Sequence, residues 1–214
     1  MNKTKPTILR TCYGCGLLNE RGIAVLELAI ILPVLLLITF AIIDFGRLFQ
    51  ARLILTNLAR EGGSIASRER DLATGTYTAA DLITMLQNGA FPLNLESSGH
   101  IYIWKIKAAE REKDDPKTAI DESKPYIDND NSDDSGSLAV QSSIGSNKTY
   151  LGLTDEIYSH LEFDTANQTA DISEVTVVEV FYRFTPVTPI ISISQTFFNT
   201  PLLNNMVISS KAVF

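Results

Sequence analysis

The chain has 214 residues, 45% of them hydrophobic, and a formal net charge of −7 at pH 7. This length allows one domain of ordinary size, with or without a membrane anchor, and argues against two large folded domains. The acidic balance argues against a nucleic-acid partner, because phosphates are neutralised by clustered Lys and Arg and the sequence has no basic stripe.

The two cysteines lie near the N-terminus, in the sequence Cys12-Tyr-Gly-Cys15. Such a pair can be a redox dithiol or half of a zinc site, but zinc takes four ligands and the two histidines, His100 and His160, lie far along the chain. The pair also lacks the usual setting of a redox dithiol, a strand that leads into a helix. We therefore expect neither a metal nor a catalytic role for these cysteines.

The 21 residues 23–43 are all apolar except Glu27, Pro33 and Thr39. As an α-helix they span about 31 Å, which matches the hydrocarbon thickness of a bilayer. A cleaved secretory signal is a poorer interpretation, since its apolar region is shorter and is followed by an A-x-A-like site. A buried core helix is also disfavoured, because a helix apolar on every face over five turns needs a larger protein around it. We predict a transmembrane helix.

Residues 44–68 continue this helix with an amphipathic pattern. Apolar side chains recur at spacings of three and four, with arginines and Glu61 at other positions. Gly62 and Gly63 each weaken a helix by about 1 kcal/mol relative to alanine, so we expect fraying or a kink there. The pattern predicts one helix of about 45 residues, with its first half in lipid and its second half on a soluble domain.

The soluble region, residues 70–214, is predicted to contain short helices and strands. Thr78-Ala-Ala-Asp81 resembles a capping box and begins a helix that ends at Gly89, and Thr154 begins another that runs to about residue 162. Strands are predicted where β-branched and aromatic residues are frequent: His100–Ala108 and the segments that begin at Val175, Ile190 and Met206. Because βαβ alternation is absent, we predict an α+β fold in which the long N-terminal helix covers a small antiparallel sheet with short helices.

Residues 110–137 form an acidic segment, with ten acidic and four basic residues between Glu110 and Asp134. Its end, DNDNSDDSGS, resembles part of a calcium loop, but an EF-hand needs glycine where Asp133 stands and glutamate near Ala139. A solvated, mobile loop is the favoured interpretation. It would still offer a variable surface for a partner or for calcium.

Catalytic motifs are not evident. The sequence has no nucleophile elbow, no phosphate-binding glycine loop and no metal-binding pair. His160, in a predicted helix, and His100, before a predicted strand, fit surface or core positions better than catalytic ones. We expect a protein without enzymatic activity, catalytic residues, cofactor or metal, and a membrane-tethered hydrolase that uses one of these histidines is the weakest alternative.

The start of the apolar run resembles a type IV prepilin cleavage site, because Arg21-Gly22 precedes Ile-Ala-Val-Leu-Glu27. The stretch LELAIILPVLLLITFAIIDFGRLFQARLILTNLAREGGSIAS is similar to the TadE-like minor pilin or pseudopilin family of the tight-adherence (Tad/Flp, type IVc) pilus system. The matching residues are Gly22, Glu27, Pro33, Asp44-Phe45-Gly46-Arg47 and Ala59-Arg60-Glu61-Gly62. The C-terminal VTVVEVFYRFTPVTPIISIS also resembles the family's ending, two strands joined by a proline-broken turn.

The resemblance implies that prepilin peptidase cuts between Gly22 and Ile23, and that Glu27 pairs with the freed amine of its own or a neighbouring chain. From the residues alone, Glu27 could instead snorkel to the nearby interface, since an acid near the edge of a span costs less than the roughly 2.5–3.5 kcal/mol it costs at the centre. Pro33 lacks an N–H and predicts a kink in the turn before it, over residues 29–32. In a pilin-like subunit this kink would mark where the helix loosens on leaving the bilayer.

Charge predicts the orientation. The leader, residues 1–22, carries Lys3, Lys5, Arg10 and Arg21 against Glu20, and this net charge of +3 is expected to stay in the cytoplasm. The resemblance then implies a single-pass protein of the bacterial inner membrane with a periplasmic C-terminal domain, which either remains there or enters an extracellular pilus. Its expected partners are other minor pilins or pseudopilins, the major pilin, prepilin peptidase and the inner-membrane assembly platform, in adhesion or secretion. The alternative is an unprocessed bitopic anchor, scaffold or envelope-binding protein.

Overall fold

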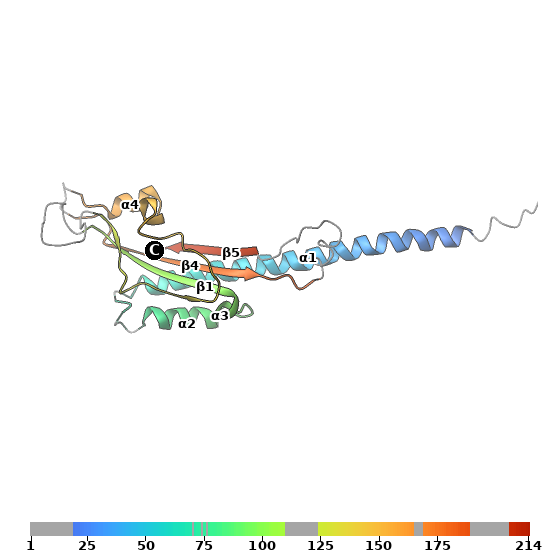
Figure 1. Ribbon diagram of the computed structural model, residues 1–214, viewed down its shortest axis with the longest axis horizontal. Helices are drawn as coiled ribbons and strands as arrows, with labels where there is room; N and C mark the ends of the chain where they lie inside the picture. Colours follow the sequence, from blue (N-terminus) through green and yellow to red (C-terminus); the bar gives the residue numbers. More distant parts are fainter. Residues whose placement is uncertain are drawn as a thin grey trace, which may run out of the picture.

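One long helix organises the molecule (Figure 1). The computed structural model describes residues 19–69, 71–73, 75, 77–109, 124–164, 169–188 and 206–214. Helix α1, Asn19–Ala66, has 48 residues. Its C-terminal half lies along a β-sheet and beside helix α2, Ala79–Gly89, while its N-terminal half projects away from the domain. The short helix α3, Leu95–Ser98, contacts the sheet.

Within the described residues, the sheet contains five antiparallel strands: β1 Gly99–Lys107, β2 Tyr126–Ile127, β3 Asp133–Gly136, β4 Glu174–Phe184 and β5 Met206–Val213. Their order is β2-β1-β4-β5, with β3 also paired to β1. Phe184 pairs with Met206 and Val177 with Val213, so β4 ends and β5 begins at the same end of the sheet. This end is the one from which the N-terminal half of α1 projects (Figure 1).

The two faces of the sheet carry two hydrophobic clusters, as expected from strands whose alternate side chains point to opposite faces. The larger cluster joins one face to α1 and α2: Leu55, Leu58, Ala59, Leu82, Leu86, Ile101, Ile103, Val178 and Val180. The smaller one covers part of the other face, near the 3-10 helix η1, Thr149–Gly152, and α4, Asp155–Leu161: Ile106, Ile144, Leu153, Leu161, Val175 and Val177.

The predicted α+β fold is confirmed, including an antiparallel sheet covered by the second half of the long helix. Both predicted helix starts are confirmed, because Thr78 and Asp81 form a capping box and the Thr154 side chain accepts a hydrogen bond from Ile157 N. Three of the four predicted strands are confirmed as β1, β4 and β5. The fourth, from Ile190, lies outside the described residues.

Two predictions need correction. The α-helix continues through Gly62 and Gly63 to Ala66, with no fraying at the glycines, because both are buried against other elements. The described part of the acidic segment is not simply a loop: Asp133–Gly136 pairs with β1, although its residues stay largely exposed, and the side chain of Asn131 is buried. Strand β2 was missed because two residues are too few to show a pattern, and β3 because Asp, Ser and Gly have low intrinsic strand preference; both are held by pairing with β1.

Candidate functional site

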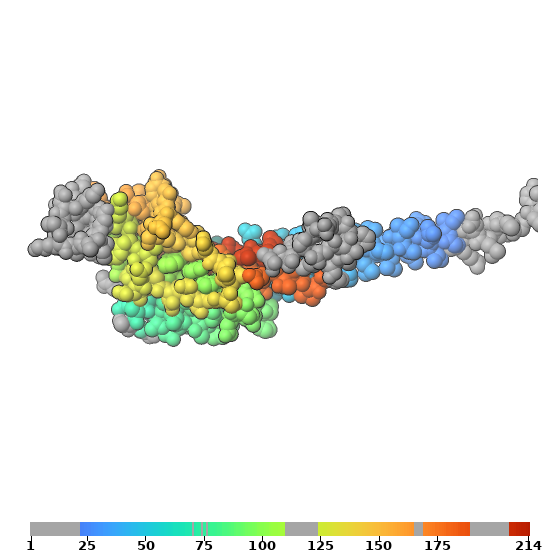
Figure 2. All heavy atoms as spheres, in the orientation of Figure 1, coloured from blue at the N-terminus to red at the C-terminus, as the bar shows by residue number. Residues whose placement is uncertain are grey.

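The N-terminal half of α1 projects beyond the domain (Figure 2), and its apolar side chains are exposed. Within the described residues, the segment Gly22–Ala66 is the one candidate membrane span, with a mean hydropathy of 2.8 in its most apolar 18-residue window and none of that window buried. Ile23 is 57% exposed and Leu35 is 59% exposed. In water such a surface would be very unfavourable, so this half of the helix fits a lipid environment.

The predicted cleavage site lies in the first turn of α1, which begins at Asn19. Glu27 is four residues beyond Ile23, so the two side chains lie on one face of the helix, one turn apart. Glu27 is exposed, and no residue in the described part of the chain pairs with it. Its carboxylate is therefore accessible to a group outside its own helix.

The other polar positions of the span are accommodated within α1. The Thr39 hydroxyl donates a 2.9 Å hydrogen bond to the Leu35 carbonyl, so it exposes no free donor to lipid. Pro33 lies inside the helix, which continues on both sides of it. The kink predicted at Pro33 stays a prediction.

Asp44, the first residue after the predicted span, is fully buried and joins α1 to the chain beyond β4. Its carboxylate accepts hydrogen bonds from Val187 N at 3.1 Å and Thr188 N at 3.5 Å, and from the Thr188 hydroxyl. These residues are more than 140 positions away in sequence. Resemblance marked Asp44 as a motif residue without a role, and no sequence signal indicated this contact.

The rest of the predicted motif divides between two faces of α1. The guanidinium carbon of Arg47 lies 6.0 Å from the centre of the Phe184 ring, at the end of β4, which is within the range of a cation–π contact. Phe45 is 49% exposed, and a Cβ added at Gly46 would meet nothing within 4 Å. Asp44 and Arg47 thus hold the end of β4, while Phe45 and Gly46 face outward.

The second motif, Ala59-Arg60-Glu61-Gly62, packs the helix onto the domain. Ala59 is fully buried, whereas Arg60 and Glu61 are exposed and are not brought near Glu27 or Asp44. A Cβ added at Gly62 would lie 2.7 Å from Leu86 Cδ1 in α2. The glycine therefore permits a close approach of two helices, a reason that sequence reading alone did not supply.

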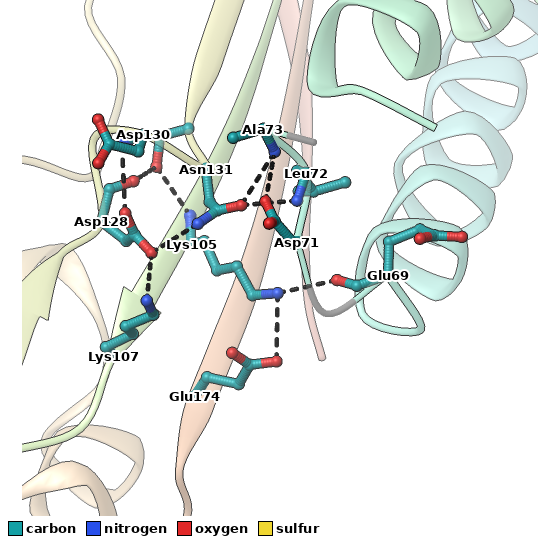
Figure 3. Close-up of polar contacts among 11 residues, drawn as sticks. Glu69, Asp71, Leu72, Ala73, Lys105, Lys107, Asp128, Asp130, Asn131 and Glu174 are labelled. Carbon is teal, nitrogen blue, oxygen red and sulfur yellow. Dashed lines mark hydrogen bonds and ion pairs between the residues drawn. The ribbon is translucent and has the colours of Figure 1, made fainter. Parts of the chain in front are cut away.

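A buried polar cluster joins the end of α1 to the sheet (Figure 3). Lys105 has no exposed surface, and its Nζ donates to the Glu69 carbonyl at 2.8 Å and pairs with Glu174 at 3.2 Å. Asn131 Oδ1 accepts from Leu72 N at 2.6 Å, which fixes the chain that follows α1. The cluster thus connects the helix to both edges of β1.

The same cluster contains Asp128, a buried carboxylate of the acidic segment. Asp128 accepts from Lys107 Nζ at 2.7 Å and from Asn131 Nδ2 at 2.8 Å (Figure 3). Burial alone would raise the pKa of Asp128, but the hydrogen bonds from Lys107 and Asn131 outweigh it and the pKa is lowered from 3.8. Correspondingly, the hydrogen bond to Asp128 raises the pKa of Lys107. Within the described residues, no group of His, Cys, Asp and Glu could hold a metal ion.

The outer face of the sheet carries an acid that sequence reading missed. Glu179, in β4, is 2% exposed and accepts hydrogen bonds from the Ser142 and Ser143 hydroxyls and from Ser143 N at 3.0 Å. Lys211 Nζ donates to Ser143 Oγ and to the Gly152 carbonyl, both at 2.9 Å. Both serine hydroxyls donate to the Glu179 carboxylate, and the Lys211 amine donates to two oxygens. The cluster therefore holds the 142–143 segment on the sheet and does not provide a nucleophile with a free base.

The two histidines also take part in ordinary polar contacts. His100 stacks on Tyr102 and lies 2.8 Å from Asp134 Oδ2, and His160 lies 3.0 Å from Asp171 Oδ2. Each pair holds neighbouring segments of the domain together. The structure does not bring the two histidines to one site.

Comparison with known proteins agrees with the N-terminal resemblance. Residues 22–64 match the family model described as TadE-like protein. No curated protein and no solved structure matches the chain. The match begins at Gly22, includes Glu27 and both motifs of α1, and ends two residues before the helix does. Most of the long helix is therefore similar to the TadE-like family, over residues 22–64.

Proposed function

We propose that this protein is a minor pilin or pseudopilin of a Tad/Flp (type IVc) pilus or secretion machine. Prepilin peptidase removes residues 1–22, α1 anchors the product in the bacterial inner membrane, and the sheet domain lies in the periplasm or in a pilus. Its partners are other minor pilins, the major pilin and the inner-membrane assembly platform. Its role is structural, without a catalytic site or cofactor, and serves adhesion or secretion.

The observation that carries this proposal is the division of α1 into two halves. The first half leaves its apolar surface exposed, and the second half is built into the core of a domain. A helix of this kind can pass from lipid into a bundle of equivalent helices while its domain stays folded. The TadE-like match over residues 22–64 covers both halves.

The start of α1 supports processing at Gly22. A Cβ added at this residue would meet nothing within 4 Å, so the glycine is not required for packing among the described residues. Cleavage after Gly22 would free an amine at Ile23, one helical turn from the accessible Glu27 carboxylate. Opposite charges at that distance would neutralise each other in the membrane, where an unpaired charge is costly.

Intact-mass measurement of the protein extracted from membranes of a strain with the Tad prepilin peptidase tests the proposal. We expect a mature chain that begins at Ile23, and Gly22→Leu should block its formation. Gly46→Leu is the matched control, since Gly46 is also a helical glycine with nothing within 4 Å of an added Cβ. An unprocessed wild-type chain would reject the proposal in favour of a bitopic anchor or scaffold.

Replacing Glu27 with glutamine separates assembly from anchoring. Glu27→Gln preserves the size of the side chain and removes its charge, so the span should insert and be cleaved normally. We expect co-isolation with other pilin subunits to be lost, whereas the exposed Arg60→Gln should have no such effect. Unchanged subunit complexes in Glu27→Gln would exclude charge pairing and favour snorkelling.

A further inference from the structure

The sheet domain exposes an apolar surface at the end from which the span projects. We call it the membrane-proximal rim and define it by five described residues that are exposed although apolar: Phe45, Phe49, Val187, Met206 and Val207. Val187 is 71% exposed and Phe49 is 63% exposed. Asp44 and the β4–β5 register bring these residues to one end of the domain, although three segments of the chain supply them.

Contacts to α1 show how far the rim lies from the span. Val187 N contacts Asp44, one residue beyond Ile43, and Phe184, which pairs with Met206, contacts Arg47. At 1.5 Å per residue, Arg47 lies about 6 Å beyond Ile43 along the helix. The headgroup layer is about 5–7 Å thick on each side of the hydrocarbon core. If residues 23–43 fill the core, the rim is therefore at the depth of the headgroups.

The charge of this end differs from that of the rest of the chain. Residues 44–53, 182–188 and 206–209 contain three arginines, Arg47, Arg52 and Arg183, all exposed, and one acid, Asp44, which is buried. After residue 22 the chain as a whole has 14 basic and 24 acidic residues. Exposed arginines beside apolar side chains suit an anionic lipid surface, where guanidinium groups meet phosphates.

We propose that the membrane-proximal rim is a second membrane contact, which lies in the headgroup layer of an anionic leaflet with Arg47 and Arg183 on lipid phosphates. This inference goes beyond the proposed function but relies on one part of it, the span formed by α1. Two contacts, the span and the rim, would prevent the sheet domain from tilting freely about the helix. The bilayer would thereby set the orientation in which the subunit is presented for assembly.

Strand β5 provides a matched pair of positions for the test. Val207 and Val213 have the same side chain, lie on the same face of the strand and are exposed by 42% and 36%. They are six residues apart, about 20 Å along the strand, and only Val207 belongs to the rim. Leu35, in the middle of the predicted span, reports insertion independently.

The experiment uses the full chain with Cys12→Ser and Cys15→Ser, one copy per nanodisc, and a single bimane-labelled cysteine. The labelled variants are Val207→Cys, Val213→Cys and Leu35→Cys. In discs with equal parts of phosphatidylglycerol and phosphatidylcholine, lipids with a nitroxide on the headgroup should quench most of the bimane fluorescence at position 207 and none of it at position 213. Acyl-chain nitroxides should remove the emission at 35. Phosphatidylcholine alone, or Arg47→Gln with Arg183→Gln, should reduce the loss at 207.

The outcomes separate the two proposals. No quenching at position 35 would show that α1 does not span the disc, and the proposed function would fail. Quenching at 35 with equal emission at 207 and 213 would overturn the rim contact alone. Equal losses at 207 in both lipid compositions would overturn the anionic surface. The label at position 207 could instead be unaffected by nitroxide lipids and change its emission wavelength only in discs that hold two copies of the protein. That result would assign the rim to contact with a second subunit and overturn the proposal.

Discussion

Loss of the Asp44 carboxylate should release the chain beyond β4 from α1 without unfolding the domain. Asp44→Ala leaves Val187 N, Thr188 N and the Thr188 hydroxyl without their acceptor. The core between α1 and the sheet does not include Asp44, so the packing of the helix should persist. The expected effect is a local opening of the junction.

The magnitude follows from the bonds lost. Hydrogen bonds to a charged group contribute about 1.5–3 kcal/mol each, and Asp44 accepts one from Val187 N at 3.1 Å and one from the Thr188 hydroxyl, while the Thr188 N contact at 3.5 Å is at the limit. Val187 is 71% exposed, so water replaces part of what is lost. We expect about 2–3 kcal/mol, which corresponds to a roughly 30- to 150-fold larger equilibrium constant for opening.

Amide hydrogen exchange of the detergent-solubilised full chain measures this opening residue by residue. The Val187 amide should exchange about 30- to 150-fold faster in Asp44→Ala than in the wild type. At the far end of the sheet, the backbone N–H of Thr176 donates to the Phe214 carbonyl and that of Phe214 donates to the Thr176 carbonyl. These two amides are the internal control, and their exchange rates should be the same in the variant and the wild type. Thr188→Val removes one of the bonds and should give a smaller, roughly tenfold increase.

A double-mutant cycle decides whether the contact acts as described. In the Asp44→Ala background, Thr188→Val should have almost no further effect on Val187, because its partner is already absent. The reasoning fails if Asp44→Ala changes the exchange of Val187 less than twofold. It also fails if the two substitutions add independently.

Two further predictions concern the stability of the folded domain. Gly62→Ala should lower the free energy of unfolding by about 1–2 kcal/mol, because its Cβ would lie 2.7 Å from Leu86, whereas Gly46→Ala should leave it unchanged or raise it by up to about 1 kcal/mol. Chemical denaturation of both variants checks this, and equal effects would contradict it. The folded-state pKa of Asp128 lies below 3.8, so its pairing with Lys107 stabilises the fold above pH 3.8 and is lost as the pH falls through that pKa. Urea midpoints measured against pH should therefore fall less steeply in acid for Asp128→Asn, and an unchanged slope would refute this role.

Local patterns in the sequence were sufficient to predict most of the helices and strands. The alternation of β1 and the turn signals before α2 and α4 depend on neighbouring residues, so strands and caps were predicted where the structure has them. Strands β2 and β3 could not be found in this way. The two residues of β2 and the polar residues of β3 form strands because β1 offers an unpaired edge, and that edge exists only after β1 has paired with β4.

The sequence was sufficient to identify the motif residues of α1, but it did not predict what these residues contact in the fold. Gly62 was interpreted as a weak point of the helix, whereas its missing side chain admits Leu86. Helix propensity describes a helix in isolation, and packing across two helices overrides it here. The buried Glu179 was not singled out, because an acid within an apolar strand gives no indication of the serines that will reach it from the 142–143 segment.

The sequence by itself determined the long helix, its apolar first half and the antiparallel character of the sheet, and it predicts the site at Gly22 and Glu27. These features depend on composition and on spacings of a few residues, which local physical rules describe well. Only the tertiary structure decided that Asp44 fastens the chain beyond β4 to the end of the predicted span, and that arginines and apolar side chains from three segments lie at that end of the domain. The Asp44–Val187 contact joins residues 143 positions apart, and no local periodicity carries information over that distance.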